Sequence, residues 1–151
     1  MLEVGPKYAW SLLAATFMNF QCTLAGVGAV NARTKYNIDA PDMGTGRQSA
    51  KLTDEEWEDL NRSVRVHMNY VEQLPTAISS VLICGLFYPT LSVCLGGSYI
   101  LGRLIYGLGY RKEAKNREIG FVMYFVPLLG LMGASVVGIT KELGLHRFNW
   151  A

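Results

Sequence analysis

Residues 65–87 read RVHMNYVEQLPTAISSVLICGLF, a segment that begins polar and ends apolar. An arginine, a histidine, an asparagine and a glutamate lie within its first eight positions, and no charged residue follows from Gln73 to Gly102. A helix that crosses the apolar core of a bilayer needs about 20 predominantly apolar residues. The segment therefore predicts a membrane-spanning helix with polar groups at one end.

Two other stretches, 8–32 and 119–140, also lack charged residues, and each is long enough for one span. The middle block is long enough for two helices at about 1.5 Å per residue, and Tyr88-Pro89 predicts a turn between them. Only 17% of the residues are charged, against about 25% in soluble domains. The sequence predicts an all-α bundle of four transmembrane helices in one integral membrane domain, residues 1–151. The expected helices lie near 8–32, 63–87, 90–111 and 118–141.

The first apolar run has an alternative interpretation as a cleaved signal peptide. Its charge-free stretch is far longer than the roughly 7–15 apolar residues typical of such peptides. The preceding residues 1–7, MLEVGPK, also carry no net positive charge. We therefore expect this run to be a membrane span.

Basic residues gather in two of the three connectors between the expected helices. The first connector, 33–62, and the third, 111–117, each contain several lysines and arginines, whereas the second contains no charge. Because cytoplasmic connectors carry an excess of Lys and Arg, both should face the cytosol, with the two termini on the other side. The net charge is only +2 and the basic residues lie at membrane edges, which does not indicate nucleic-acid binding.

The long first connector divides into two parts. Residues 37–50, NIDAPDMGTGRQSA, are rich in turn-forming residues and predict a loop. Thr53, followed by the acidic residues 54–56, is typical of a helix N-cap with a capping box. We expect a short amphipathic helix to begin there and to run into the second span, with Trp57 and Leu60 at the membrane interface.

The cysteines and histidines predict neither a disulfide nor a metal site. Cys22, Cys84 and Cys94 lie in predicted spans without a CxxC partner, and buried cysteines commonly pack as small hydrophobic residues. His67 and His146 are isolated from other ligand types. We therefore expect no metal cofactor.

The polar end of the opening segment has a helical spacing. Arg65, Asn69 and Glu72 are separated by four and three residues, so a helix puts them on one face. Ionisable groups at membrane depth are costly and tend to face the bundle interior or a cavity. This face is therefore a candidate binding surface.

Arg103, Tyr106 and Tyr110 repeat this spacing on the third expected span. One interpretation is structural: an Arg–Glu pair holds two helices together, and the tyrosines lie at the membrane interface. The other is a shared site, which is favoured because Arg33 and Arg117 fall at the same end of the bundle. Guanidinium groups bind carboxylates bidentately, and a carboxylate suits an ammonium group. The predicted ligand is an amino acid or peptide with more than one carboxylate.

These motifs resemble one known family. RVHMNYVE, residues 65–72, is similar to the R-x-H-x-N-x-x-E motif of the membrane-associated proteins in eicosanoid and glutathione metabolism. GRLIYGLGY, residues 102–110, is similar to the third-helix segment of that family. PKYAW at 6–10 and ARTKYNIDAP at 32–41 also match. The chain resembles the third type of microsomal glutathione S-transferase more than the leukotriene-forming synthases.

The resemblance implies a homotrimer that holds glutathione, as a co-substrate, between neighbouring subunits near the cytosolic face. Arg117 matches the arginine with which the leukotriene-forming synthases activate the thiol. Thr34 stands where those synthases have a second arginine and Gln73 where they have a tyrosine, so the resemblance does not extend to leukotriene synthesis. The residues implied to contact glutathione are Arg33, Arg65, His67, Asn69, Glu72, Gln73, Tyr106 and Tyr110.

The implied activity is that of a membrane-bound glutathione transferase or peroxidase. The thiolate is the nucleophile, and Arg117 would stabilise it for attack on lipophilic electrophiles or lipid hydroperoxides from the bilayer. The alternative is a non-catalytic structural or lipid-binding subunit of a larger membrane assembly. The connector 37–62 and the C-terminal LHRFNWA, 145–151, would then be docking surfaces. The family likeness implies the endoplasmic reticulum or a mitochondrial membrane.

Overall fold

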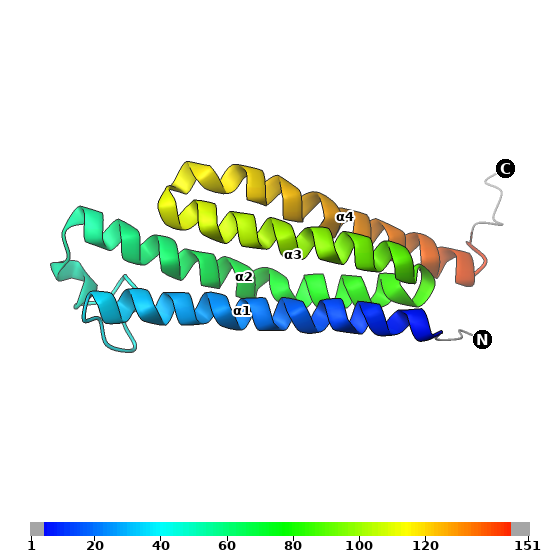
Figure 1. Cartoon of the computed structure of the whole chain (residues 1–151), viewed down its shortest axis with the longest axis horizontal. Helices are drawn as coiled ribbons and strands as arrows, with labels where there is room; N and C mark the ends of the chain where they lie inside the picture. Colours follow the sequence, from blue (N-terminus) through cyan, green and yellow to red (C-terminus); the bar gives the residue numbers. More distant parts are fainter. Residues whose placement is uncertain (1–4, 146–151) are drawn as a thin grey trace.

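The computed structural model describes residues 5–145, which form a bundle of four long helices (Figure 1). Residues 1–4 and 146–151, which include His146 and most of LHRFNWA, lie outside the described residues. The long helices are α1 (Ala9–Lys35), α2 (Asp54–Phe87), α3 (Pro89–Lys112) and α4 (Arg117–Glu142). The short 3-10 helices are η1 (Pro6–Tyr8), η2 (Ser49–Lys51) and η3 (Ala114–Asn116).

The helices pack in a simple order. α1 packs mainly on α2, and α4 packs mainly on α3, while α2 and α3 contact each other. Successive helices run in opposite directions, so the α1–α2 connector and the α3–α4 loop lie at one end of the bundle (Figure 1). The predicted all-α bundle of four helices is confirmed.

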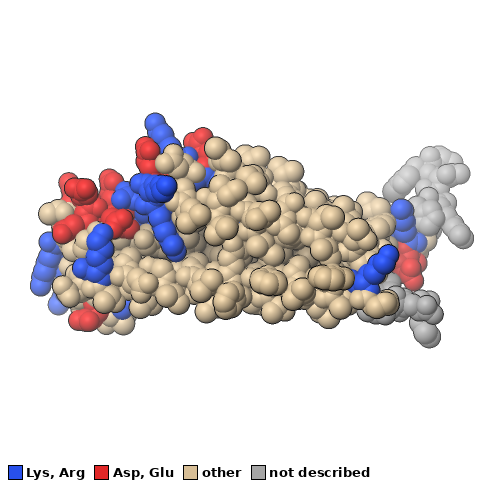
Figure 2. Space-filling view, viewed as in Figure 1, with Lys and Arg blue, Asp and Glu red and all other residues tan. Residues whose placement is uncertain are grey.

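The surface of the bundle suits a bilayer. Each long helix contains an 18-residue window of mean hydropathy between 1.3 and 2.0, and large apolar side chains such as Phe17 and Val126 point outward. Charged side chains gather at the two ends and leave the middle of the visible face free (Figure 2). At about 1.5 Å per residue, the 34 residues of α2 extend about 51 Å. The charged start of α2 therefore projects beyond an apolar core of about 30 Å.

The start of α2 is fixed by a capping box. The Thr53 hydroxyl accepts a hydrogen bond from the Glu56 backbone N–H at 3.4 Å, and the Glu56 carboxylate accepts one from the Thr53 N–H at 3.0 Å. As predicted, this helix runs directly into the second span, passing Pro75 without a break. Tyr88 separates the two helices, and α3 begins at Pro89, the second residue of the predicted turn.

Glycines let α3 and α4 approach each other closely. A Cβ added to Gly102 would collide with the backbone of Met123 and Tyr124, and one added to Gly120 would collide with the backbone of Tyr106. Only a residue without a side chain fits such backbone contacts. The contact brings the start of α4 against the tyrosines of α3.

The connector is built around one acidic side chain. The Asp42 carboxylate accepts hydrogen bonds from the Ser49 hydroxyl and from four backbone N–H groups at 2.9–3.0 Å. Those four groups belong to Gly44, Gly46, Gln48 and Ser49. These bonds, that from the Ser49 backbone above all, hold the pKa of the Asp42 carboxyl well below its usual value.

The connector also covers a small apolar cluster. Leu60 is fully buried there with Ile38 and Val64, so the prediction that it lies at the membrane interface is wrong. Trp57 remains 42% exposed and donates its indole N–H to the Gly44 carbonyl at 2.8 Å. The reason for the difference is that the loop folds back over the first turns of α2.

Candidate functional site

Side chains of α2, α3 and α4 line two adjoining cavities, here called the polar cleft. The two cavities share Asn69, Tyr106 and Arg117. Their volumes are about 510 and 370 Å³, within the roughly 300–1,000 Å³ usual for ligand pockets. The larger cavity is also lined by Gln73, Glu118, Phe121, Val122 and Tyr124. The smaller is also lined by Arg65, Met68, Glu72 and Tyr110.

α2 supplies a cation, an amide and an anion to the smaller cavity. Arg65, Asn69 and Glu72 all line it, as their helical spacing predicts. Val66 and Tyr70, on the other side of the helix, are buried in the main core. Core packing therefore fixes the rotation of α2 that turns the three polar side chains into the cleft.

α3 and α4 supply the opposite wall. The ring centroids of Tyr106 and Tyr110, one turn apart on α3, are 5.6 Å apart. The Arg117 Cζ atom lies 5.0 Å from the Tyr110 ring centroid. Arg117 is the first residue of α4, and the close contact at Gly120 brings it to the tyrosines.

Arg103 does not line the cleft, although its spacing groups it with the tyrosines. It is only 4% exposed, and its Nη1 donates to Asn69 Oδ1 at 2.8 Å. The Arg103 side chain points into the core of the bundle, where the Asn69 carbonyl accepts this hydrogen bond and holds the guanidinium. With its carbonyl occupied by Arg103, Asn69 retains its two amide N–H donors for a ligand.

Two predicted site residues lie elsewhere within the single chain. Arg33 donates from Nε to the Ile38 carbonyl at 3.3 Å and contacts Met43 Sδ through Nη1 at 3.6 Å, so it anchors the connector. His67 packs against α1, where a Cβ added to Gly26 would lie 3.1 Å from its Cε1. The chain thus brings seven of the nine predicted residues to the cleft, and not these two.

The cleft also contains residues of α4 that were not predicted from the sequence. Tyr124 lines the larger cavity, and its hydroxyl accepts a hydrogen bond from Gln73 Nε2 at 3.3 Å. Phe121 packs against it with ring centroids 5.5 Å apart. Helical spacing could have predicted both residues, because positions 121 and 124 are four and seven residues after Arg117 and share its helical face.

The charges of the cleft are available to a ligand. Among residues 5–145, the ion pairs within 4.0 Å involve only Lys35, Glu58, Asp59 and Arg62, at the end of the bundle that carries the α1–α2 connector. Glu72 is paired neither with Arg65 of its own helix nor with Arg103 of α3 or Arg117 of α4. Among the described residues, no Arg–Glu ion pair of the cleft therefore joins two helices, as the structural interpretation would require. The cleft instead offers guanidinium groups to anions and a carboxylate to a cation.

Comparison with known proteins identifies the family. The sequence profile of the MAPEG family matches residues 11–137. The chain is 30% identical over 144 residues to human microsomal glutathione S-transferase 2, covering 91% of this chain and 88% of that protein. It is 26% identical over 135 residues to an uncharacterized protein of Synechocystis sp., covering 89% of this chain and 90% of that protein.

The predicted family is confirmed, while the likeness to the third microsomal type stays a prediction. The family match covers most of the chain. The four long helices are each apolar enough to cross a bilayer. This is an integral, multi-pass membrane protein, and the chain belongs to the MAPEG family.

Proposed function

We propose that the protein binds glutathione in the polar cleft and activates its thiol for transferase or peroxidase chemistry. Glutathione carries two carboxylates, one ammonium group and one thiol. Arg65 suits a carboxylate, Glu72 suits the ammonium group, and the Asn69 amide suits a peptide carbonyl. The name of the human relative, microsomal glutathione S-transferase 2, supports this choice of ligand.

The main support for the proposal is the position of Arg117. It lines both cavities of the cleft, the charged one with Arg65 and the larger one with Phe121 and Val122. These two apolar side chains are 41% and 56% exposed, so the larger cavity opens beside the lipid-facing surface of α4. A thiol at the junction would meet a guanidinium on one side and a lipophilic substrate on the other.

The required electrostatic effect is modest. A cysteine thiol has a pKa of about 8.5, so only a few per cent is thiolate at neutral pH. Lowering that pKa by about two units requires roughly 2.7 kcal/mol of preferential interaction with the anion. One guanidinium at hydrogen-bond distance in a partly desolvated site supplies an interaction of this size.

The chemistry uses the thiolate as a nucleophile. In transfer, its sulfur attacks an electrophilic carbon, and the leaving group departs with the bonding electron pair. In peroxide reduction, the sulfur attacks the terminal oxygen, the O–O bond breaks, and the alkoxide takes a proton. A second glutathione then forms the disulfide and releases water. Arg117 stabilises the attacking anion, and the other cleft residues orient glutathione.

The proposed assembly is a homotrimer in which a neighbouring copy completes the cleft. Arg33 and His67 lie outside the cleft of their own chain, and a neighbour would supply them. Co-expression of Arg33→Ala and Arg117→Ala chains tests this arrangement, because some mixed sites would contain both arginines. Activity above that of either variant alone is expected. Two chains that never complement each other would exclude a shared site.

The direct test of the function uses the purified, detergent-solubilised protein. Conjugation of glutathione to an aromatic electrophile, reduction of a lipid hydroperoxide and a glutathione-dependent rise in Tm are each expected. Absence of all three would contradict the proposal and favour the alternative of a non-catalytic structural or lipid-binding subunit. Fractionation of cells that express the tagged full chain tests the proposed endoplasmic reticulum or mitochondrial membrane.

A further inference from the structure

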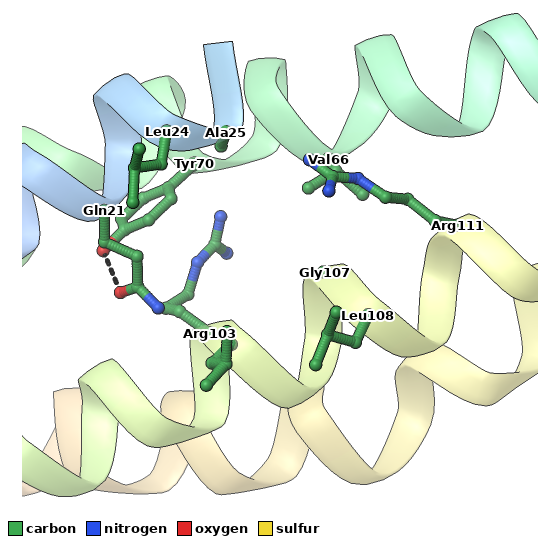
Figure 3. A pocket seen from close by; sticks show the side chains of 10 residues that line it. Gln21, Leu24, Ala25, Val66, Tyr70, Arg103, Gly107, Leu108 and Arg111 are labelled. Atoms are coloured by element: carbon green, nitrogen blue, oxygen red, sulfur yellow. Dashed lines mark hydrogen bonds between the residues drawn. The ribbon is translucent and has the colours of Figure 1, made fainter. Parts of the chain in front are cut away.

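A third cavity lies on the other side of the α2–α3 contact. It is lined by α1, α2 and α3, whereas the polar cleft is lined by α2, α3 and α4. Figure 3 shows its polar members, Gln21, Tyr70, Arg103 and Arg111, around one open space. Gln21 and Tyr70 are already joined by a hydrogen bond of 2.7 Å. The two arginines are therefore the groups that remain for a ligand.

Both arginines retain unused hydrogen-bond donors. The buried Nε of Arg103 and the buried Nε of Arg111 have no hydrogen-bond partner. Within residues 5–145, neither guanidinium has a carboxylate oxygen within 4.0 Å. Arginine is not deprotonated in proteins, so the cavity carries two positive charges without a counter-charge from the described chain.

Aromatic rings compensate Arg103 only in part. Its Cζ atom lies 4.2 Å from the ring centroid of Tyr70, 4.6 Å from that of Tyr124 and 5.1 Å from that of Tyr106. Ring faces attract a cation through their quadrupole, but they carry no net negative charge. A buried ion loses its hydration and needs an opposite charge to offset that loss. An anion in the cavity would provide it.

The backbone of α1 is shaped around Arg111. A Cβ added to Gly28 would collide with Nη2 of Arg111 and would lie 2.9 Å from its Cζ. The guanidinium therefore rests directly on α1, and Figure 3 shows the Arg111 side chain extending from α3 beside the open space. This position keeps the second charge beside the cavity instead of in the water beyond the last turn of α3.

The rest of the lining is apolar and faces outward. Leu24, Leu104 and Leu108 line the cavity and are 53%, 50% and 55% exposed. The cavity volume is about 120 Å³, well below the roughly 300–1,000 Å³ of sites that enclose a whole ligand. A small anionic group fits inside, and an attached chain would have to lie along the three leucines.

We propose that this cavity binds the acidic head group of a membrane lipid. Arg103 and Arg111 donate to the head-group oxygens, and the acyl chains lie on the leucine surface between α1 and α3. Basic pockets between transmembrane helices are suited to acidic lipids, and Arg111 lies in the last turn of α3, at the end of the bundle that carries the α1–α2 connector. The bond from Arg103 Nη1 to Asn69 remains intact, because the head group uses Nε.

The test measures lipid retention by native mass spectrometry of the purified full chain in nanodiscs. Dioleoyl phosphatidic acid is the probe, and dioleoyl phosphatidylcholine is the neutral comparison. Arg111→Gln should weaken phosphatidic acid retention about tenfold, the effect of one lost charged hydrogen bond. Lys112→Gln is the matched control, because it removes the same charge one residue away and does not line the cavity.

A second variant separates charge from position. Gly28→Val keeps both arginines but occupies the space of the Arg111 guanidinium, and it should weaken retention to a similar extent. Equal retention of the two lipids, or equal losses in Arg111→Gln and Lys112→Gln, would overturn the proposal. Displacement of phosphatidic acid by millimolar inorganic phosphate would also overturn it, since the site would then bind a soluble anion.

Discussion

The part of the connector around Asp42, residues 37–52, here called the Asp42 loop, and the polar cleft both concentrate polar groups toward the end of the bundle that carries the α1–α2 connector, but they use them in opposite ways. The Asp42 carboxylate is saturated by backbone N–H groups and a hydroxyl. In the cleft, Gln73 Oε1 is buried without a hydrogen-bond partner, and Arg65 and Arg117 have no ion pair among the described residues.

The difference distinguishes polar groups that hold the fold together from polar groups that remain free to bind a ligand. A saturated polar network rigidifies a fold because each group already has its partner. An unsaturated buried group costs free energy and persists where a ligand or another function compensates it. The Asp42 loop is therefore expected to govern local stability, and the polar cleft to govern binding and turnover.

The largest effect is expected from removing the proposed activating charge. Arg117→Ala should lower turnover about a hundredfold, the usual cost of losing one preorganised charge-stabilising group. Glutathione affinity, measured by calorimetry, should change far less. Lys115→Ala is the matched control, because this nearby exposed cation lines neither cavity of the cleft. Equal losses of affinity and turnover in Arg117→Ala would indicate a structural arginine instead.

The α3–α4 contact is the next most sensitive point. Gly102→Ala places a methyl group against the backbone of α4 and should cost about 1–3 kcal/mol, as overpacking does. Gly97→Ala, on the same helix with no neighbour within 4 Å of its Cβ position, should be neutral or slightly stabilising. A lower Tm in Gly102→Ala alone, with weaker glutathione binding, would show that the cleft depends on this packing. Equal Tm values in the two variants would argue against it.

The Asp42 loop should respond to charge without affecting the cleft. The pKa of the Asp42 carboxyl is lowered in the fold. The stability that its ionised form contributes is therefore fully present above the usual carboxyl pKa of about 4. That stability is lost as the pH falls toward the lowered pKa. Asp42→Asn should reproduce the loss at neutral pH, with several-fold faster hydrogen exchange in 37–52 and unchanged turnover. The exposed Asp39→Asn is the control; equal exchange in both variants would contradict a special role for Asp42.

The smallest effect is expected at Gln73. The only hydrogen bond of its side chain, within the described residues, is the 3.3 Å bond to the Tyr124 hydroxyl, so Gln73→Leu should leave Tm nearly unchanged. If the free amide oxygen meets glutathione, affinity should fall about threefold to tenfold, the range for one net hydrogen bond. Unchanged affinity together with a lower Tm would place Gln73 with the saturated, structural groups.

Much of the fold followed from local features of the sequence. The charge-free runs predicted four spans because a bilayer core admits only long apolar helices. Thr53 and Glu56 predicted the start of α2, and the spacing of Arg65, Asn69 and Glu72 predicted their shared face. These predictions depend on neighbours within a few turns of the same helix, which a sequence displays directly.

The tertiary structure decided how those faces meet. It turned Arg103 into the core, added Tyr124 to the cleft and kept Arg33 with its own connector. It also put Arg117 beside Tyr110, through backbone contacts that exist because Gly102 and Gly120 lack side chains. The physical reason is that helical periodicity fixes which residues share a face, whereas the rotation and contact of each helix come from packing between segments far apart in the chain.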